Sequence, residues 1–497
     1  MSIGRLVRTV RYLKLRQIWF QVWRRVQRAI EPHPKCGDGE LPEFTFLNLT
    51  AKPQGWNDIS LDMLWRYNLH YFDGLATKNT NGIDDCVGLV ERWIAENPKG
   101  SIPGWDPYPT SLRIVNWVKY LNNNLTLSAP HRLRVEDSLR DQLHWLANHV
   151  EWHILANHLM ANLKALVIGN KWFGSESAKW MRLYKEQIEE QILPDGGHFE
   201  RSIMYHAIML EDALDVIKFC GDDATWLKPV AEKMLRYLVN MTGPDGKIAM
   251  FNDAAEGVAK STEWLACYAK RLGIEVPKVE PFADFPDIGY TRMSAGDFVL
   301  FVDSAPIGPD YQPGHAHADT LTYELYYKGR KIVRDVGTSE YRGLRRSYER
   351  SSAAHNVAAV DGRDSSEVWS SHRVGRRARI VAREVSPTRL FAVHSGYGVA
   401  IGREFRLSDE GLIISEIAPV GRKCDTRVHL TDNAVMTHGT GEMCLEYGDL
   451  CFDGFTVSED YLYAIGFGRL EKGKCLCAGF DNGEYVYKIL KANKGQK

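Results

Sequence analysis

The chain of 497 residues holds 62 Lys and Arg against 63 Asp and Glu, with 44% hydrophobic and 25% charged residues, which is typical of a soluble globular protein. This length exceeds one ordinary hydrophobic core, so we expect two large domains. The net charge of −1 excludes a polycation built to bind nucleic acid. Nine scattered cysteines, an odd number, argue against a disulfide framework.

The first thirty residues differ from the rest, because they hold eight Lys and Arg and no acid. Apolar residues recur among these cations at helical spacing, so residues 1–50 are predicted to be a segment that begins with a basic amphipathic helix. Such a helix can lie on an anionic membrane surface or pack on the next domain with a solvated basic face. Without a recognisable secretory signal or membrane span, we expect a cytoplasmic protein or one peripheral to the inner membrane, with a periplasmic location by an unrecognised route as the alternative.

Residues 51–280 show the spacing of one helix after another. Apolar residues recur every three or four positions, and Pro-Asp-Gly-Gly and Gly-Pro-Asp-Gly stretches mark turns between helices. Many short helices of similar length predict helix pairs that close into a toroid or a solenoid. The predicted helices cover residues 61–72, 111–122, 133–150, 153–169, 175–192, 202–219, 225–240 and 262–272.

Residues 281–497 follow a different pattern. Short runs rich in Val, Ile and Tyr alternate with polar turns, which is typical of a large antiparallel sandwich. The predicted fold class is therefore α+β multidomain, all-α and then all-β, with a junction close to residue 280. The predicted strands cover residues 298–303, 321–327, 331–336, 356–360, 379–385, 390–394, 399–407, 412–417, 426–430, 461–466 and 485–490.

A Pro-Gly-His-Ala-His-Ala-Asp stretch is the most informative motif of the chain. It places His315, His317 and Asp319 on alternate positions before a strand-like run, so the two imidazoles can face one side. Asp335 and His355 follow further along, on neighbouring predicted strands. Two histidines and a carboxylate form a plausible zinc set, which leaves His315 free for proton chemistry.

The helical part holds two further polar clusters. Asn157 and His158 stand among apolar neighbours on a predicted helix, although a buried Asn and a packing His would give the same pattern. Glu200 and Ser202 suit a helix start, and Tyr205 falls in the first turns of that helix. A tyrosine can act as acid or base where cations lower its pKa, and the alternative is a ring that packs with its hydroxyl at the surface.

These segments together resemble the heparinase II/III-like family of polysaccharide lyases. The resemblance spans roughly residues 55–365, and several motifs in the same order are more specific than any one of them. The matching motifs, among them Asp-Gly-Gly-His-Phe-Glu-Arg-Ser and Gly-His-Ala-His-Ala-Asp, lie at residues 65–72, 104–109, 113, 116–117, 156–158, 195–202, 205, 314–319, 335–338 and 354–356.

The resemblance implies an N-terminal (α/α) toroid followed by a C-terminal antiparallel β-sandwich. It also implies a lyase that cleaves a uronate-containing acidic polysaccharide by β-elimination. Asn157 and His158 would neutralise the uronate carboxylate. Tyr205 would move protons at the scissile linkage, and His315 matches the catalytic histidine of the family.

The resemblance further implies a zinc ion, expected to be structural, held by His317, Asp335 and His355. No organic cofactor and no nucleic-acid partner are expected, and the oligomeric state stays open. Residues 328–350 hold eight Lys and Arg against three acids, which suits an acidic polymer, although a solvated β-surface has the same composition. The candidates for substrate binding are Glu200, Arg201, Tyr341 and Tyr348.

Two other functions compete with a lyase that acts in bacterial capsule or exopolysaccharide metabolism. A glycoside hydrolase on the same scaffold would use paired carboxylates such as Asp195 and Glu200, which a turn and a helix start explain more easily. A non-catalytic glycan-binding component of polysaccharide assembly would bind the polymer without turnover.

Overall fold

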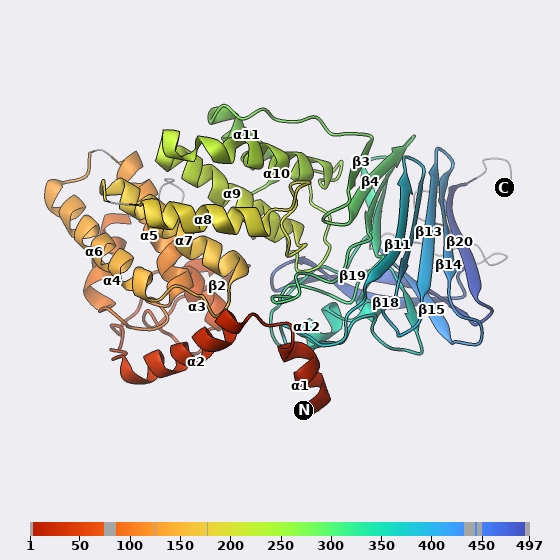
Figure 1. The fold of residues 1–497 in the computed structure, drawn as a ribbon, viewed down its shortest axis with the longest axis horizontal. Coiled ribbons are helices and arrows are strands. Elements are labelled where there is room, and N and C mark those ends of the chain that lie inside the picture. The colour runs from red at the N-terminus through yellow and green to blue at the C-terminus, as the bar shows by residue number, and fades with distance from the viewer. Residues whose placement is uncertain are drawn as a thin grey trace. The chain divides into compact units, whose positions relative to one another are not determined.

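The chain folds into two compact units that alternate along the sequence (Figure 1). The computed structural model describes residues 3–73, 86–124, 126–175, 177–431, 443–444 and 450–492. The helical unit comprises residues 14–191 and 212–228. The sheet unit comprises residues 1–13, 192–211 and 229–497.

The helical unit is built around one central helix, α7 (Ala156–Trp172), which is buried along most of its length. It packs against α5, α6 and α8, and an apolar surface on all sides is what a helix in such a position requires. The other elements of this unit are α2 (Leu15–Ile30), β1 (Phe44–Phe46), β2 (Leu49–Ala51), α3 (Met63–Leu69), α4 (Cys86–Glu96), α5 (Pro107–Asn123), α6 (Ala129–Asn148) and α8 (Ala178–Gln191).

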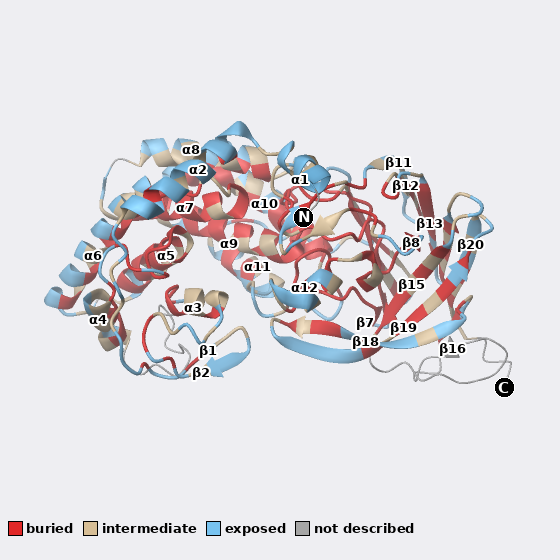
Figure 2. Cartoon of the chain, turned by 90° about the horizontal axis from the view of Figure 1, so that it is seen from below, coloured by how far each residue is buried: buried red, intermediate tan, exposed pale blue. Residues whose placement is uncertain are grey.

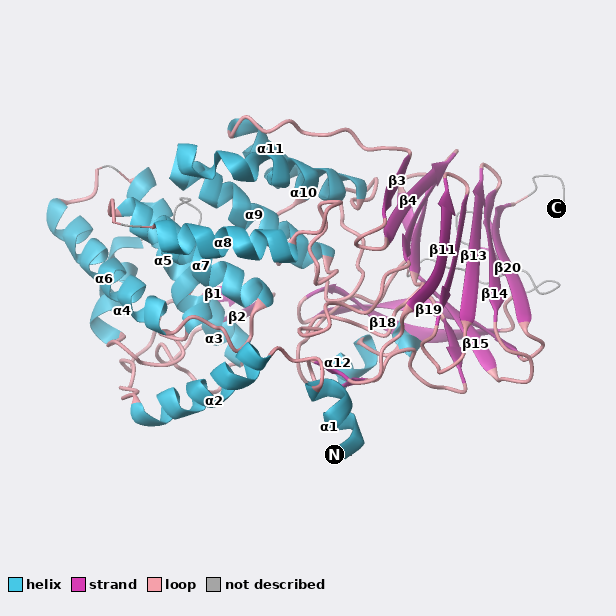
Figure 3. Cartoon of the chain, viewed as in Figure 1, coloured by secondary structure: helices cyan, strands magenta, loops and turns pink. Residues whose placement is uncertain are grey.

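The sheet unit begins with helices and continues with strands (Figure 3). Helix α9 belongs to both units, because its first nine residues fall in the sheet unit and the rest in the helical unit. Ser202 precedes this helix, and its hydroxyl accepts a hydrogen bond from the Tyr205 N–H at 3.2 Å, as a helix cap does. The helices concerned are α1 (Ile3–Val10), α9 (Ile203–Cys220), α10 (Lys228–Asn240), α11 (Thr262–Arg271) and α12 (Gly343–Glu349).

Two large antiparallel sheets form the rest of this unit. The first has the order β18-β19-β15-β7-β6-β5-β4-β3, with β8 paired to β15, and the second β11-β12-β13-β14-β20-β17-β16. The first consists of β3 (Phe282–Phe285), β4 (Tyr290–Ala295), β5 (Phe298–Asp303), β6 (Tyr323–Tyr327), β7 (Arg330–Val333), β8 (Ala358–Val360), β15 (Cys424–Leu430), β18 (Val457–Gly466) and β19 (Arg469–Phe480). The second consists of β11 (Ile380–Ser386), β12 (Arg389–His394), β13 (Ile401–Ser408), β14 (Gly411–Ile417), β16 (Met443–Cys444), β17 (Leu450–Asp453) and β20 (Glu484–Lys491), and a separate pair of β9 (Val368–Trp369) and β10 (Arg373–Val374) precedes it.

Both sheets contribute to one hydrophobic core, which Figure 2 shows as buried strands. Phe298 and Leu325 come from the first sheet, and Phe405, Ile414 and Tyr487 from the second. Side chains alternate between core and solvent along β12, whose residues are half-buried and buried in turn. This alternation is the pattern of an antiparallel sheet with one covered face.

The predicted order of helices followed by antiparallel sheets is confirmed, with each predicted helix present and its ends shifted by a few residues. The single basic helix expected at the N-terminus is two helices, α1 and α2. The prediction missed, among others, α4, α12, β3, β4, β17 and β19. The β19 sequence is rich in Lys, Glu and Gly, which hides its strand character. The toroid, the sandwich and the domain limits at residues 50 and 280 stay predictions.

A buried ion pair connects the sheet core to the loops at its edge. Arg403 on β13 donates through Nε to Glu416 Oε2 on β14 at 3.0 Å. The same guanidinium donates to the carbonyls of Leu321 and Asn356, at 2.7 Å for Leu321. Leu321 has a φ of 72°, a backbone region that costs energy for a bulky residue and needs support from its surroundings. Arg403 supplies part of that support.

In Arg403→Met, Glu416 keeps a buried charge without its partner and two backbone carbonyls lose a donor. We expect the free energy of unfolding to fall by about 3–5 kcal/mol. Arg406→Met is the matched control on the same strand, because Arg406 is 64% exposed and its pair with Glu404 is worth about 0–1 kcal/mol. Urea denaturation followed by circular dichroism measures both variants. Equal losses would contradict the role given to Arg403.

Candidate functional site

The two histidines of the His-x-His motif converge on one buried carboxylate, Asp253. His315 Nδ1 lies 2.8 Å from Asp253 Oδ2, and His317 Nε2 lies 2.8 Å from Asp253 Oδ1. The motif lies in a loop before β6 and not in extended chain. The shared partner, and not strand alternation, therefore brings the two imidazoles together.

Arg346 on α12 balances the charge of Asp253. Its guanidinium donates to both carboxylate oxygens, at 2.8 Å from Nη2 to Oδ2, and Thr338 Oγ1 donates to Oδ1 at 3.2 Å. Burial alone would raise the pKa of the Asp253 carboxyl, but the Arg346 charge and the hydrogen bonds to His315 and His317 hold it well below its usual value. Asp253 is therefore a fixed anion that can orient both imidazoles.

Tyr205 lies directly against His315. The two rings are stacked with their centroids 3.8 Å apart and an interplanar angle of 27°. The Tyr205 hydroxyl is 2.9 Å from the hydroxyl of Tyr341, whose pKa is raised, mainly by burial and then by the charge of Asp253. Tyr205, His315 and Tyr341, all candidates from the sequence and Tyr341 among them as a binding residue, thus form one group. We call it the proton-transfer group after the role proposed for it below.

Glu200 and Arg201 lie next to this group but inside the protein. Glu200 is 1% exposed, and its Oε1 is 3.9 Å from His315 Nε2. The Arg201 guanidinium donates to the carbonyls of Ile288 at 3.1 Å and Phe199 at 3.2 Å, so it holds the backbone around the group. Substrate binding by these two residues stays a prediction.

A second group of potential ligands adjoins Asp253. His317, Asp319 and His355 bring one ligating atom each within 4.8 Å of one another. Among the described residues, His317 Nδ1 and His355 Nε2 are buried without a hydrogen-bond partner. Burial lowers the pKa of His317 to about 3, so its imidazole is neutral, the form that binds metals. Two imidazole nitrogens and a carboxylate fit a zinc ion.

Asp335, predicted as the carboxylate ligand, lies on the other side of the His355 ring. Its oxygens are 3.0 and 2.9 Å from His355 Nδ1, and Thr322 Oγ1 donates to Oδ2 at 3.0 Å. Burial alone would lower the pKa of His355, but the Asp335 carboxylate raises it. The structure thus brings Asp319 into the ligand group, and it places Asp335 where a partner that orients a metal-binding histidine is usually found.

Asn157 and His158 belong to the helical unit and lie in the first turn of α7. The two residues before them, Leu155 and Ala156, have positive φ angles of 68° and 49°, so the chain turns sharply into the helix. The first N–H groups of a helix have no partner within it and carry a partial positive charge. This end of α7 is therefore suited to hold an anion.

Glu151 fixes the orientation of His158. Its Oε1 is 3.2 Å from His158 Nδ1, while Asn162 Nδ2 donates to Oε2 at 3.1 Å. Burial alone would raise the pKa of Glu151, but His158 and His153 lower it, so the carboxylate is charged. With Nδ1 held by Glu151, the Nε2 atom of a partly exposed His158 can face a ligand.

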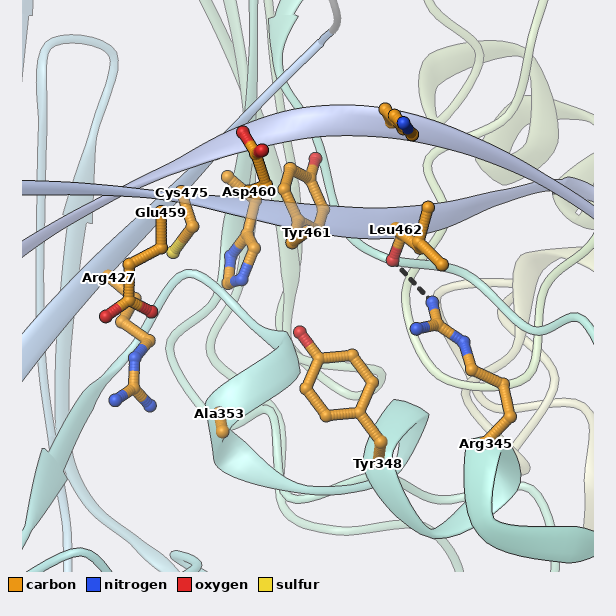
Figure 4. A pocket seen from close by; sticks show the side chains of 11 residues that line it. Arg345, Tyr348, Ala353, Arg427, Glu459, Asp460, Tyr461, Leu462 and Cys475 are labelled. Carbon is orange, nitrogen blue, oxygen red and sulfur yellow. Dashed lines mark hydrogen bonds between the residues drawn. The ribbon is translucent and has the colours of Figure 1, made fainter.

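Tyr348, the last predicted binding residue, lies apart from the proton-transfer group. It lines a cavity of about 580 Å³ in the sheet unit, where its ring stands near Tyr461 and Arg345 (Figure 4). Neither Tyr205, His315 nor Tyr341 lines this cavity. Tyr341 and Tyr348 are thus separated, although α12 connects them in the chain.

Sequence reasoning missed the residues that hold the site together. Asp253 stands in a Phe-Asn-Asp-Ala-Ala stretch without any recognisable spacing to the histidines. Arg346 is one of many cations in its segment, and Glu151 gives no signal of its own. Asp319 alone carries a signal, because it belongs to the same motif as His315 and His317.

Comparison with known proteins finds matches along both the helical and the sheet part of the sequence. Residues 86–274 match the family described as "Heparinase II/III N-terminus", and residues 277–486 match "Heparinase II/III-like, C-terminal". A heparin-sulfate lyase of Bacteroides stercoris is 22% identical over 247 residues, 43% of this chain and 37% of that protein. A heparin-sulfate lyase of Bacteroides thetaiotaomicron is 21% identical over 312 residues, 52% of this chain and 44% of that protein. The matched regions span less than half the length of these two relatives.

A crystal structure of heparinase III superposes with a TM-score of 0.68 at 15% identity, covering 86% of this chain and 76% of that chain. At this identity the likeness shows a shared fold of helices and antiparallel sheets. The two family matches follow one another in order and together span most of the sequence. The chain therefore belongs to the heparinase II/III-like family.

Proposed function

We propose that the protein is a polysaccharide lyase that cleaves a uronate-containing acidic polymer by β-elimination. The observation that carries this proposal is the proton-transfer group, in which Tyr205 stacks on His315 and shares a hydrogen bond with Tyr341. Membership of the family and the names of its relatives support the same reaction. Within the proposal, the helices close into a toroid, the two sheets form a sandwich, and the substrate is a bacterial capsule polymer or exopolysaccharide.

The reaction needs a base and an acid at neighbouring atoms of the substrate. The C5 proton beside a uronate carboxylate is weakly acidic, and its removal must be followed by loss of the O4 leaving group. Because Asp253 can accept a hydrogen bond from His315 Nδ1, Nε2 is the ring nitrogen that we assign as the base. Tyr205 is the second proton-transfer residue and returns a proton to O4.

The charge that develops on the uronate carboxylate must be stabilised. We assign this to Asn157 and His158 at the start of α7, where side-chain donors and the helix N-terminus favour an anion. Removing one such donor typically costs about 2.7–4 kcal/mol of barrier. Hydrolysis by Asp195 and Glu200 is less well supported, because Asp195 accepts backbone N–H groups of Ile288 and Gly197.

We also propose that His317, Asp319 and His355 hold a zinc ion, with Asp335 orienting His355. When bound, zinc would supply a structural link between the loop before β6 and the loop before β8. The neutral His317 and the two buried ring nitrogens without partners among the described residues support this site. The zinc ion takes no part in proton transfer in this proposal, which assigns that step to His315 and Tyr205.

The function is tested with a panel of uronate polymers: heparan sulfate, hyaluronan, alginate and bacterial exopolysaccharides. We expect the ultraviolet absorbance of an unsaturated uronate to rise with at least one polymer. Tyr205→Phe should lower kcat about 10²–10⁴-fold, because a positioned proton donor is lost. Tyr485→Phe, on β20, is the matched control and should keep full activity. New reducing ends without a double bond would indicate a hydrolase, and binding without turnover would indicate a glycan-binding protein.

Asp253→Asn removes the anion that Arg346 and both histidines share. The buried guanidinium loses its charged partner, so we expect the free energy of unfolding to fall by about 3–5 kcal/mol. Adding Arg346→Met should restore part of this stability, since no buried charge then lacks a partner. Activity should stay low in both variants because His315 is no longer oriented. Thermal unfolding and the lyase assay separate the two effects, and full activity in Asp253→Asn would refute the orienting role.

Protein produced in zinc-containing medium should hold about one zinc per chain by mass spectrometry of the metal. His355→Ala should lose this metal, whereas His144→Ala, on the exposed surface of α6, should keep it. Removal of the metal by a chelator should lower the melting temperature by several degrees, because an ion that binds only the folded state stabilises it. Metal-free protein with an unchanged melting temperature would contradict the site.

A further inference from the structure

Helix α2 packs on the helical unit with its polar side. Gln17 and Gln27 are buried, and their amides donate to the carbonyls of Ile154 at 3.4 Å and Asn148 at 3.3 Å. Between them Arg24 is half-buried. Most helices on a protein surface do the reverse and bury their apolar side. The apolar residues of α2 are therefore left without a place in the core.

These apolar residues form one continuous outward stripe, which we call the outer face of α2. They recur at the spacings i, i+3, i+4, i+7, i+8, i+11 and i+15, and each is 38–85% exposed. In Figure 2 most of this helix is drawn as exposed. The outer face consists of Leu15, Ile18, Trp19, Val22, Trp23, Val26 and Ile30.

Helix α1 repeats the arrangement within the sheet unit. Its polar side is attached through Arg8, which donates to both oxygens of Glu367 at 2.9 and 2.8 Å, and through Thr9, which accepts from Trp369 Nε1 at 3.1 Å. Its apolar residues point outward and are 39–81% exposed. They are Ile3, Leu6, Val7 and Val10.

The charge around these faces indicates what covers them. Residues 1–30 hold eight Lys and Arg and no acid. Arg25 borders the outer face of α2 on one side and Arg16 on the other, as the helical spacing requires, and both are exposed. Apolar residues flanked by cations, with tryptophans among them, match the boundary between headgroups and acyl chains of an anionic bilayer.

A second copy of the chain is a less suitable partner for the outer face of α2 than an anionic membrane. Five of the eight cations already pair with acids elsewhere in the chain, namely Glu367, Glu190 and Asp106. A two-fold interface through the outer face would bring Arg16 and Arg25, which border it, close to the same residues of the other copy. Among the described helices, none is long and apolar enough to cross a membrane. A helix that lies in the membrane surface needs no such length.

We infer that α2 is a peripheral membrane anchor that binds anionic lipid through its outer face and the arginines that border it. This inference does not depend on the proposed lyase reaction. It adds a place of action, the surface of an anionic membrane, to whatever chemistry the protein performs there.

The test uses the full chain and sedimentation with vesicles. We expect binding to phosphatidylcholine vesicles that contain about 30% phosphatidylglycerol, weak binding to pure phosphatidylcholine, and loss of binding as salt screens the arginines. Trp19→Glu/Val22→Glu should lower the partition coefficient more than about tenfold, because two apolar contacts become charged. Ile59→Glu is the matched control, since Ile59 is 83% exposed in the same unit but outside α2.

Light scattering after gel filtration tests whether a second copy of the chain, and not a membrane, covers the outer face of α2. Unchanged vesicle binding in Trp19→Glu/Val22→Glu, or no binding to anionic vesicles at low salt, would overturn the inference. So would a wild-type dimer that the double substitution converts to monomers, because the outer face would then be occupied by a second copy. The double variant should unfold at the same temperature as the wild type. Loss of vesicle binding then comes from the changed outer face and not from misfolding, and it supports the inference.

Discussion

The charge pair of Asp253 and Arg346 is the interaction on which the site in the sheet unit depends. Its members come from distant parts of the chain, since Asp253 follows α10 and Arg346 lies on α12. The same carboxylate binds His315 on one oxygen and His317 on the other. One ion pair thus sets the positions of the proton-transfer group and the ligand group together. Burying such a pair carries a desolvation cost, so the pair adds little net stability. Its contribution is to hold the side chains around it in fixed positions.

Both units use unusual backbone at their candidate functional residues. Leu155 and Ala156 have positive φ before Asn157, and Arg201 has a φ of 60° shortly before Tyr205. Such conformations cost about 1–3 kcal/mol each and persist only where the surroundings enforce them. For Arg201 the surroundings are visible, because its own guanidinium donates to the carbonyl of Phe199, just before the turn, and to that of Ile288, in the segment before β4. In both units the strained turn comes immediately before a helix that carries a candidate functional side chain.

The sequence was sufficient to predict those helices, strands and site residues that show a local pattern of residue types. Helical spacing predicted the helices from residue 107 to 271, and Val- and Tyr-rich runs predicted strands such as β5 with correct ends. The motifs led to Tyr205, His315 and Tyr341, which do lie together. Asp253 could not be predicted, because its role arises from contacts across more than sixty residues. Asp319 stands in the His-x-His motif itself, but the side of the His355 ring that Asp319 and Asp335 each occupy depends on the folded loops and not on local pattern.

The contacts of Arg403 have a consequence for how the protein opens. This side chain is held by Glu416 in the sheet core, and it in turn holds the carbonyls of Leu321 and Asn356. Asn356 directly follows His355, and Leu321 closes the loop that carries His315 and His317. These loops are therefore part of the same cooperative folding unit as the core and do not open as independent flaps. In the proposed reaction, access of a polymer chain would then depend on segments other than the ones that carry the histidines.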